Sequence, residues 1–154
     1  MTDERPSIWL DGDGSPATVR EVLFRAAERR KVPVTVVANR HQSTPKLRWI
    51  RMVVVEAGFD VADDYIVAHC RPGDLVITND VPLAAEVIER GAIAVRCRGE
   101  LLTEANVRQR LATRDMLDAL RGGGVMTGGP SPFSPADKQR FANTLDRWLT
   151  AAGW

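Results

Sequence analysis

The chain has 154 residues, of which 44% are hydrophobic and 27% are charged, and its formal net charge is +1. This length and composition are typical of one soluble domain with a buried core, and the near-neutral charge argues against a protein that binds nucleic acid with a wholly basic surface. No apolar run approaches the ~18 residues that cross a bilayer, and the polar, acidic start does not resemble a signal peptide. We therefore expect a cytoplasmic protein that does not bind membranes.

The first two thirds of the chain alternate short apolar runs with amphipathic stretches. The apolar runs predict strands at residues 8–10, 34–37, 50–55, 75–78 and 93–97. Between them we expect a helix with Ser15 as its N-cap and Pro16 at its first position, a short helix capped by Asp60, and a helix over about residues 83–90. Strands that alternate with helices predict an α/β fold with a parallel sheet and right-handed crossovers.

The pattern after residue 99 is helical instead. Thr103 is a candidate cap for a long helix over residues 103–121, and a last helix is expected over residues 134–151. Residues 122–133 between them are rich in glycine and proline and lack the Gly-Lys-Ser/Thr of a phosphate-binding P-loop, so we interpret them as a lid or docking loop.

The whole chain is interpreted as one domain, with an α/β core of about residues 7–99 and a helical extension of about residues 100–154. The extension could pack on its own sheet or on a partner, so the sequence leaves a homo-oligomer open.

Acidic side chains follow two of the predicted strands. Asp11 and Asp13 come directly after the first strand, and Asp80 follows the fourth. In an open parallel sheet, ligands bind beyond the carboxyl ends of the strands where the strand order reverses, so neighbouring strands would bring these acids into one crevice. Carboxylates this close together cannot all stay ionised without a cation, and their hard oxygen atoms suit Mg²⁺ or Mn²⁺. The three residues are therefore predicted to be catalytic metal ligands, although a solvated turn or helix capping would also account for them.

Further candidates surround this crevice. Asp63 and Asp64 share a helix face with Asp60, so one of them could complete the metal cluster, or all three could simply favour the helix N-terminus. The residues expected to orient the ligands or a water molecule beside the metal are Thr78, Asn79 and Ser15.

Basic and polar residues elsewhere could position a substrate. Asn39 and Arg40 begin a loop that carries several basic residues and no acid, which would suit a phosphodiester backbone or be an ordinary solvated loop. Arg114 in the long helix could face a phosphate or form a structural salt bridge. RNA or another phosphodiester is therefore the expected partner.

Other site classes fit poorly. An EF-hand loop starting at Asp11 would need glycine and glutamate where the chain has Pro16 and Val22. Cys70 and Cys97 lack metal-ligand spacing and are expected to be reduced, buried thiols. The histidines form no persuasive nucleophile–base pair with a cysteine.

Several segments together resemble the YaiI/YqxD-type family of uncharacterised bacterial proteins, a relative of the PIN-like nuclease domains. The segments that carry the resemblance are residues 8–16, 36–39, 53–55, 58–64, 73–84, 112–115 and 128–134. The family usually reads Asp-Ala-Asp-Ala-Cys-Pro where this chain has Asp11-Gly12-Asp13-Gly14-Ser15-Pro16, so a thiol at position 15 is not part of the expected chemistry. The resemblance implies a PIN-like open parallel sheet in the order 3-2-1-4-5, flanked by helices, with two C-terminal helices. It assigns no established activity.

The leading hypothesis is a divalent-metal-dependent nuclease or phosphodiesterase, a hydrolase for which RNA is favoured by analogy with PIN-like domains. One alternative is a phosphatase of the haloacid-dehalogenase type, in which Asp11 attacks phosphorus and Asp13 is the acid/base. The other is a module that binds metal or nucleic acid without catalysis.

Overall fold

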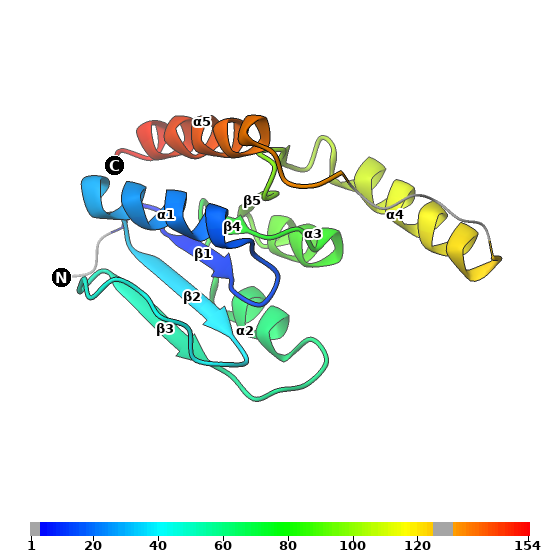
Figure 1. Ribbon diagram of the computed structural model, residues 1–154, viewed down its shortest axis with the longest axis horizontal. Helices are drawn as coiled ribbons and strands as arrows, with labels where there is room; N and C mark the ends of the chain where they lie inside the picture. Colours follow the sequence, from blue (N-terminus) through cyan, green and yellow to red (C-terminus); the bar gives the residue numbers. More distant parts are fainter. Residues whose placement is uncertain (1–3, 125–130) are drawn as a thin grey trace.

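A six-stranded sheet in the order β3-β2-β1-β4-β5-β6 forms the centre of the molecule, in a computed structural model that describes residues 4–124 and 131–154 (Figure 1). The strands are β1 (Ile8–Asp11), β2 (Val34–Ala38), β3 (Ile50–Val54), β4 (Leu75–Ile77), β5 (Ile93–Val95) and β6 (Leu101–Leu102). The first five are parallel to their neighbours, and β6 is antiparallel to β5. The predicted order 3-2-1-4-5 is confirmed, and a sixth strand that the sequence did not reveal extends it at one edge.

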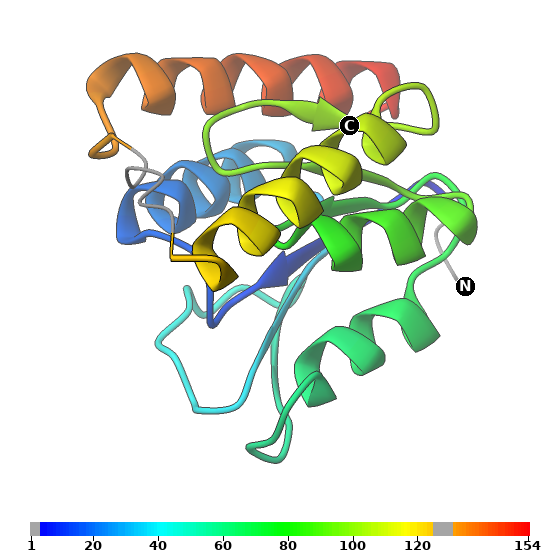
Figure 2. The same ribbon diagram turned by 90° about the vertical axis from the view of Figure 1, so that its right-hand side faces the viewer.

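Helices cover both faces of the sheet, which gives a three-layer α/β/α architecture (Figure 2). On one face lie α1 (Ala17–Arg30) and α5 (Pro135–Ala151), and on the other lie α2 (Val61–His69) and α3 (Val81–Glu89). Successive residues of a strand point to opposite faces, so Ile8 and Leu10 join the core under α1 and α5 while Trp9 joins the core under α2 and α3. Burial on both faces explains why the strands are continuous apolar runs.

The remaining helix, α4 (Val107–Gly122), extends beyond the sheet and is mostly exposed (Figure 1). It packs against α3, and Val107 is its one buried residue. The two expected C-terminal helices therefore have different surroundings. Whereas α4 is largely solvated, α5 contributes Phe141, Leu145 and Leu149 to the core.

Two helices begin later than the sequence indicated. The N-cap position of α1 is Pro16, because the Ser15 hydroxyl donates to the Asp11 carbonyl oxygen at 2.6 Å instead of capping the helix. The long helix begins at Val107 and not at Thr103. Asn106 explains this delay, since its side chain accepts from the Thr103 backbone N–H and closes a turn ahead of the helix.

Several smaller expectations can also be compared with the structure. Cys70 and Cys97 are free and buried, as predicted. Part of the glycine- and proline-rich loop, residues 125–130, lies outside the described residues, so its role as a lid or docking loop stays a prediction. Within the described ranges, no helix is long and apolar enough to cross a membrane.

Candidate functional site

The carboxyl ends of β1 and β4 meet at one edge of the sheet. The two strands are parallel neighbours in which Leu10 pairs with Ile77, so Asp11 and Thr78 follow at the same level. The Thr78 hydroxyl donates to Asp11 Oδ2 at 2.8 Å. Because β2 lies on the other side of β1, this is the point where the strand order reverses, and it is the expected place for a ligand in such a sheet.

Asp11 is nearly buried there, with 8% of its surface exposed. Burial raises the pKa of its carboxyl group, the Thr78 hydroxyl lowers this pKa, and the negative charges of Asp80 and Asp13 raise it again, with a net rise above the ordinary value. Asp80 and Asp13 are thus near enough to Asp11 for their negative charges to disfavour its ionised form.

Asp63 on α2 lies beside Asp11 and Asp80, and we call these three residues the acid cluster. Burial, followed by the charges of Asp80 and Asp11 and a hydrogen bond with the Asp80 carboxylate, raises the pKa of Asp63 to about 7. Asp80 also caps α3, since its Oδ1 accepts from the Leu83 backbone N–H at 3.1 Å. The cap uses only Oδ1 of Asp80, so this residue can cap α3 and also belong to the acid cluster.

Asp13 is oriented differently from the other acids. Its two carboxylate oxygens accept from the Asn39 backbone N–H, at 3.0 and 3.3 Å. The turn that carries it approaches β2 closely: a Cβ on Gly12 would lie 3.1 Å from the Ala38 Cβ and from Gln42 Oε1. Asn39 thus positions Asp13 through its main chain, and Asp13 lies at the margin of the cluster.

The acidic side chains fit a divalent cation in their chemistry but do not enclose one. Across residues 4–124 and 131–154, no three His, Cys, Asp or Glu side chains are arranged to hold a metal ion among themselves. Mg²⁺ often binds one or two carboxylates and completes its shell with water and substrate phosphate. The residues that could do so here are Asp11, Asp80 and Asp63, whose mutual repulsion a cation would relieve.

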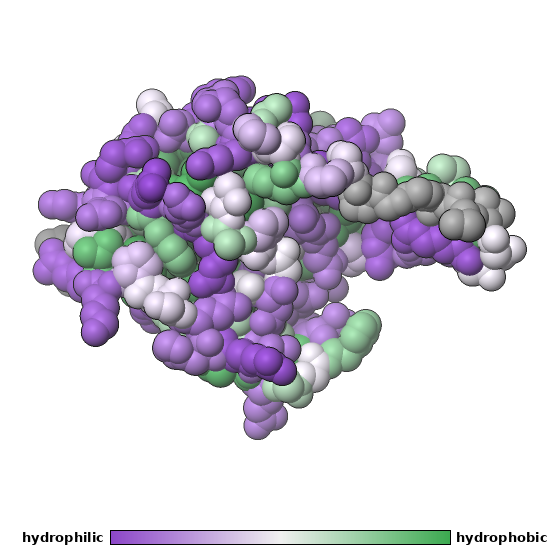
Figure 3. Space-filling view, viewed as in Figure 1, coloured by the Kyte–Doolittle hydropathy of each residue, from purple (hydrophilic) through white to green (hydrophobic). Residues whose placement is uncertain are grey.

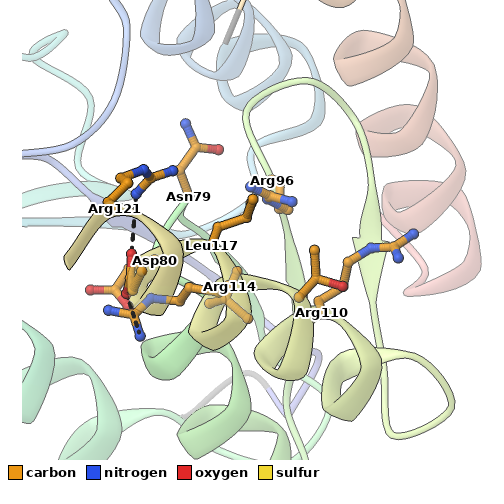
Figure 4. Close-up of a pocket in the computed structure, with 10 residues that line it drawn as sticks. Asn79, Asp80, Arg96, Arg110, Arg114, Leu117 and Arg121 are labelled. Atoms are coloured by element: carbon orange, nitrogen blue, oxygen red, sulfur yellow. Dashed lines mark hydrogen bonds and ion pairs between the residues drawn. The ribbon is translucent and has the colours of Figure 1, made fainter. Parts of the chain in front are cut away.

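A cavity of about 400 Å³ adjoins these acids and is rich in arginine (Figure 4). Arg96 follows β5, whereas Arg110, Arg114 and Arg121 come from α4. Figure 4 shows these arginines spread along one side of α4, with Arg110 at the end away from Arg121. We call this the arginine cavity. Asn79 and Asp80 also line it.

The arginines of this cavity have acidic neighbours. Arg110 binds Glu100 through two nitrogens, with its Nη2 2.7 Å from Oε2. Arg114 and Arg121 both contact Asp118, at 3.5 and 3.1 Å. Arg114 thus forms the salt bridge that was one of its two expected roles, and it also lines a cavity together with three other arginines.

A second cavity of about 250 Å³ is predominantly acidic. We call it the acidic cavity; its lining includes Phe59, Asp60, Asp63, Asp64, Asp80, Glu86 and Arg114. Asp80 and Arg114 line both cavities, so the two adjoin one another. In the space-filling view the surface is hollowed between α4 and the loop that leads into α2 (Figure 3).

The other expected site residues have varied positions. The Asn79 side chain accepts from the Cys97 backbone N–H at 2.8 Å and borders the arginine cavity. Ser15 contacts the main chain of Asp11 and not its carboxylate. Arg40 is exposed and lines neither the acidic nor the arginine cavity.

Sequence analysis missed three of the four arginines in the arginine cavity: Arg96, Arg110 and Arg121. A signal was present, because Arg110, Arg114 and Arg121 recur at intervals of four and seven residues, which places them on one helix face. What the periodicity does not reveal is that this face lies over the carboxyl end of β4.

The structure gives little support to the phosphatase alternative. Asp13, its expected acid/base, is bound to the Asn39 backbone. The three lysines of the chain, Lys31, Lys46 and Lys138, line neither of the two cavities.

Comparison with known proteins places this site in a family context. The family described as "Uncharacterized BCR, YaiI/YqxD family" matches residues 9–151. The chain is 55% identical over 142 residues to a UPF0178 protein of Shewanella baltica (strain OS155), which covers 92% of this chain and 95% of the relative. It is 53% identical over 143 residues to a UPF0178 protein of Cronobacter sakazakii, which covers 93% and 95% respectively. No solved structure matches the chain.

Proposed function

The chain belongs to the YaiI/YqxD family of uncharacterised bacterial proteins, and from the geometry of its site we propose that it is a divalent-metal-dependent phosphodiesterase that acts on RNA. One observation carries this proposal. The acidic cavity, which could hold a cation, and the arginine cavity, which could hold phosphate, share Asp80 and Arg114. A phosphodiester that lay across this boundary would contact both halves of the site.

Asp80 and Asp63, which line the acidic cavity, would hold Mg²⁺ or Mn²⁺ there, and Asp11 beside them at the end of β1 would be the third ligand. When bound, such an ion supplies an activated water molecule and neutralises charge on the phosphate. The chain contributes orientation. The Thr78 hydroxyl fixes the Asp11 carboxylate and also accepts from the Asp80 backbone N–H at 3.0 Å, so a single side chain ties together the two acid-bearing loops.

The basic half would bind the phosphates on either side of the scissile bond. Arginine suits this role because its planar fork can donate two hydrogen bonds to one phosphate. Arg114 and Arg121 are about half exposed in their ion pairs with Asp118. Exposed pairs of this kind contribute about 0–1 kcal/mol, so a phosphate can replace the carboxylate with little loss.

RNA is the proposed substrate on fold-level analogy, because the observed strand order agrees with the PIN-like arrangement. The two cavities support a phosphodiester next to a cation and do not distinguish between ribose and deoxyribose.

The test is cleavage of a labelled single-stranded RNA in Mn²⁺ by the wild-type protein and by Asp11→Asn. Loss of a metal ligand removes several kcal/mol of transition-state stabilisation, so the variant should be at least about a hundred-fold slower. The matched control is Asp146→Asn on α5, whose exposed carboxylate faces Arg29 and is not one of the acids whose charges act on Asp11 or Asp63. It should retain wild-type activity.

Equal cleavage by the wild type and Asp11→Asn would refute the proposed function. Binding of Mn²⁺ and RNA by the wild type without any cleavage would identify a non-catalytic binding module instead. A covalent phosphate on Asp11 would favour the phosphatase alternative.

A further inference from the structure

We propose that Phe59 is a base-stacking residue, and that the substrate of this site is therefore a single-stranded nucleic acid with an unpaired base next to the phosphate that is cleaved. This inference rests on the proposed function and adds a specificity residue to it.

Phe59 is unusual in its exposure. It is 94% exposed, whereas the next most exposed large hydrophobic residue in the described part of the chain, Met116, is 57% exposed. A phenylalanine normally loses most of its contact with water when a protein folds. The ring of Phe59 is thus available for a ligand.

No packing role within residues 4–124 and 131–154 accounts for this ring. Phe59 directly precedes Asp60, the N-cap of α2. A hydrophobic residue at this position often packs against the fourth residue of the helix. That residue here is Asp64, a carboxylate that lines the acidic cavity. Phe59 is also absent from both hydrophobic clusters of the core.

The position of Phe59 relative to the charged groups points to the kind of ligand. Phe59 lines the acidic cavity together with Asp63, Asp80 and Arg114. A phosphate bound by Arg114 and by a cation at Asp80 would place its own nucleoside or a neighbouring one beside the ring. Single-strand-binding proteins commonly combine a positively charged groove for the backbone with an aromatic platform for the bases, and here Arg114 and a bound cation would supply the positive charge.

The surroundings of Phe59 differ from the centre of a typical protein interface. Protein interfaces usually have an apolar centre from which charged residues are depleted. Around Phe59, in contrast, the cavity is lined by five carboxylates and one arginine, so a nucleic acid strand would bind there together with the cation that the proposed function places at these acids. In the space-filling view the exposed hydrophobic surface of the loop into α2 forms a small patch that faces the hollow below α4 (Figure 3). Stacking also requires an accessible base face, which a double helix does not offer.

The test is the affinity of four proteins for a fluorescent ten-nucleotide RNA strand, measured by anisotropy in Ca²⁺, with strand integrity checked afterwards by electrophoresis. The proteins are the wild type, Phe59→Ala, Phe59→Trp and Met116→Ala. Removal of one base–aromatic stack should weaken binding by Phe59→Ala roughly five- to a hundred-fold. Phe59→Trp should bind as tightly as the wild type. Met116→Ala, which removes an exposed apolar side chain from α4, should stay within about twofold of the wild type.

A strand of the same length without bases provides the decisive comparison. Wild type and Phe59→Ala should bind this abasic strand with equal, weakened affinity, because the stack has already been lost. Equal affinity of the two proteins for the normal strand, or the same difference between them on both strands, would overturn the inference. So would self-association of the wild type that Phe59→Ala abolishes while RNA affinity is unchanged.

The result is separable from that of the proposed function. If Asp11→Asn cleaves RNA as well as the wild type but Phe59→Ala loses base-dependent affinity, the phosphodiesterase proposal fails and base stacking stands. If Asp11→Asn is inactive and Phe59→Ala binds RNA normally, the phosphodiesterase proposal stands and base stacking by Phe59 is refuted.

Discussion

The carboxylates of the acid cluster lie close to one another and are partly buried, which disfavours their ionised forms. Asp11 and Asp63 are partly or largely buried beside Asp80, and their pKa values are raised as a result of burial and of neighbouring negative charge. A chain selected only for stability would have a neutral side chain in such a place. Perturbed carboxyl groups in a cavity are a frequent property of functional sites, and here they lie where the fold itself places ligands.

The titration of Asp63 in the metal-free protein gives the first prediction. Its carboxyl carbon should titrate near pH 7 by NMR, and Asp80→Asn should lower this pKa because it removes a negative charge. The pKa of Asp63 in the folded state lies above its unfolded value, so between pH 4 and 7 the folded protein binds more protons than the unfolded chain. The free energy of unfolding should therefore fall as the pH rises through this window.

Asp63→Asn should remove this part of the pH dependence of stability, which chemical denaturation at a series of pH values would measure. Titration of Asp63 at the ordinary value of an exposed aspartate would show that the acids do not converge.

Arg114 gives the second prediction, which concerns substrate binding. It lines both cavities, so Arg114→Ala should remove one phosphate contact. For a single strand, each such contact contributes about −0.7 to the slope of log K against log salt, and the slope should become shallower by about this amount. The control is Arg108→Ala, an exposed arginine on the same helix that lines neither cavity. Indistinguishable salt slopes for the two variants would remove Arg114 from the binding site.

At the scale of single elements, hydrophobic periodicity located the strands and most helices, but the exact beginnings depended on side chains that bind the main chain. Ser15 binds the Asp11 carbonyl and Asn106 binds the Thr103 backbone N–H, so in both cases the helix begins later than its sequence pattern. The last helix, α5, begins where the sequence predicted, because Ser134 and Asp137 form a reciprocal capping box there. The strand β6 has only two residues, which is too short for a periodic signal.

The turn between β5 and β6 gives the third prediction. Gly99 has a φ of +93°, and a Cβ at this position would lie 2.6 Å from the Arg140 carbonyl carbon in α5. Gly99→Ala should therefore destabilise the protein by at least about 1 kcal/mol. It should also weaken RNA binding, because the turn begins at Arg96 of the arginine cavity.

The matched control for this turn is Gly122→Ala at the end of α4, where a Cβ would meet nothing within 4 Å. This change should be neutral or stabilise the protein by up to about 1 kcal/mol. Urea denaturation of both variants measures the difference. Equal stabilities would show that the turn does not pack against α5 as described.

At the scale of the whole molecule, the topology brings the site together. The alternation of strands and helices restricts the chain to few arrangements, which is why the meeting of Asp11 and Asp80 could be predicted from sequence. The placement of α4 could not, because a helix with one buried residue carries little information about its neighbours. The arginine cavity was missed for the same reason, although three of its four arginines share one face of α4.

The most direct test of the account is the anomalous diffraction of a crystal soaked in Mn²⁺. We predict a manganese peak in contact with carboxylate oxygens of both Asp11 and Asp80, and no peak there in Asp11→Asn crystals soaked in the same way. A well-ordered crystal of the wild-type protein with no manganese between these two residues would contradict the account, as would a peak that persists in the variant.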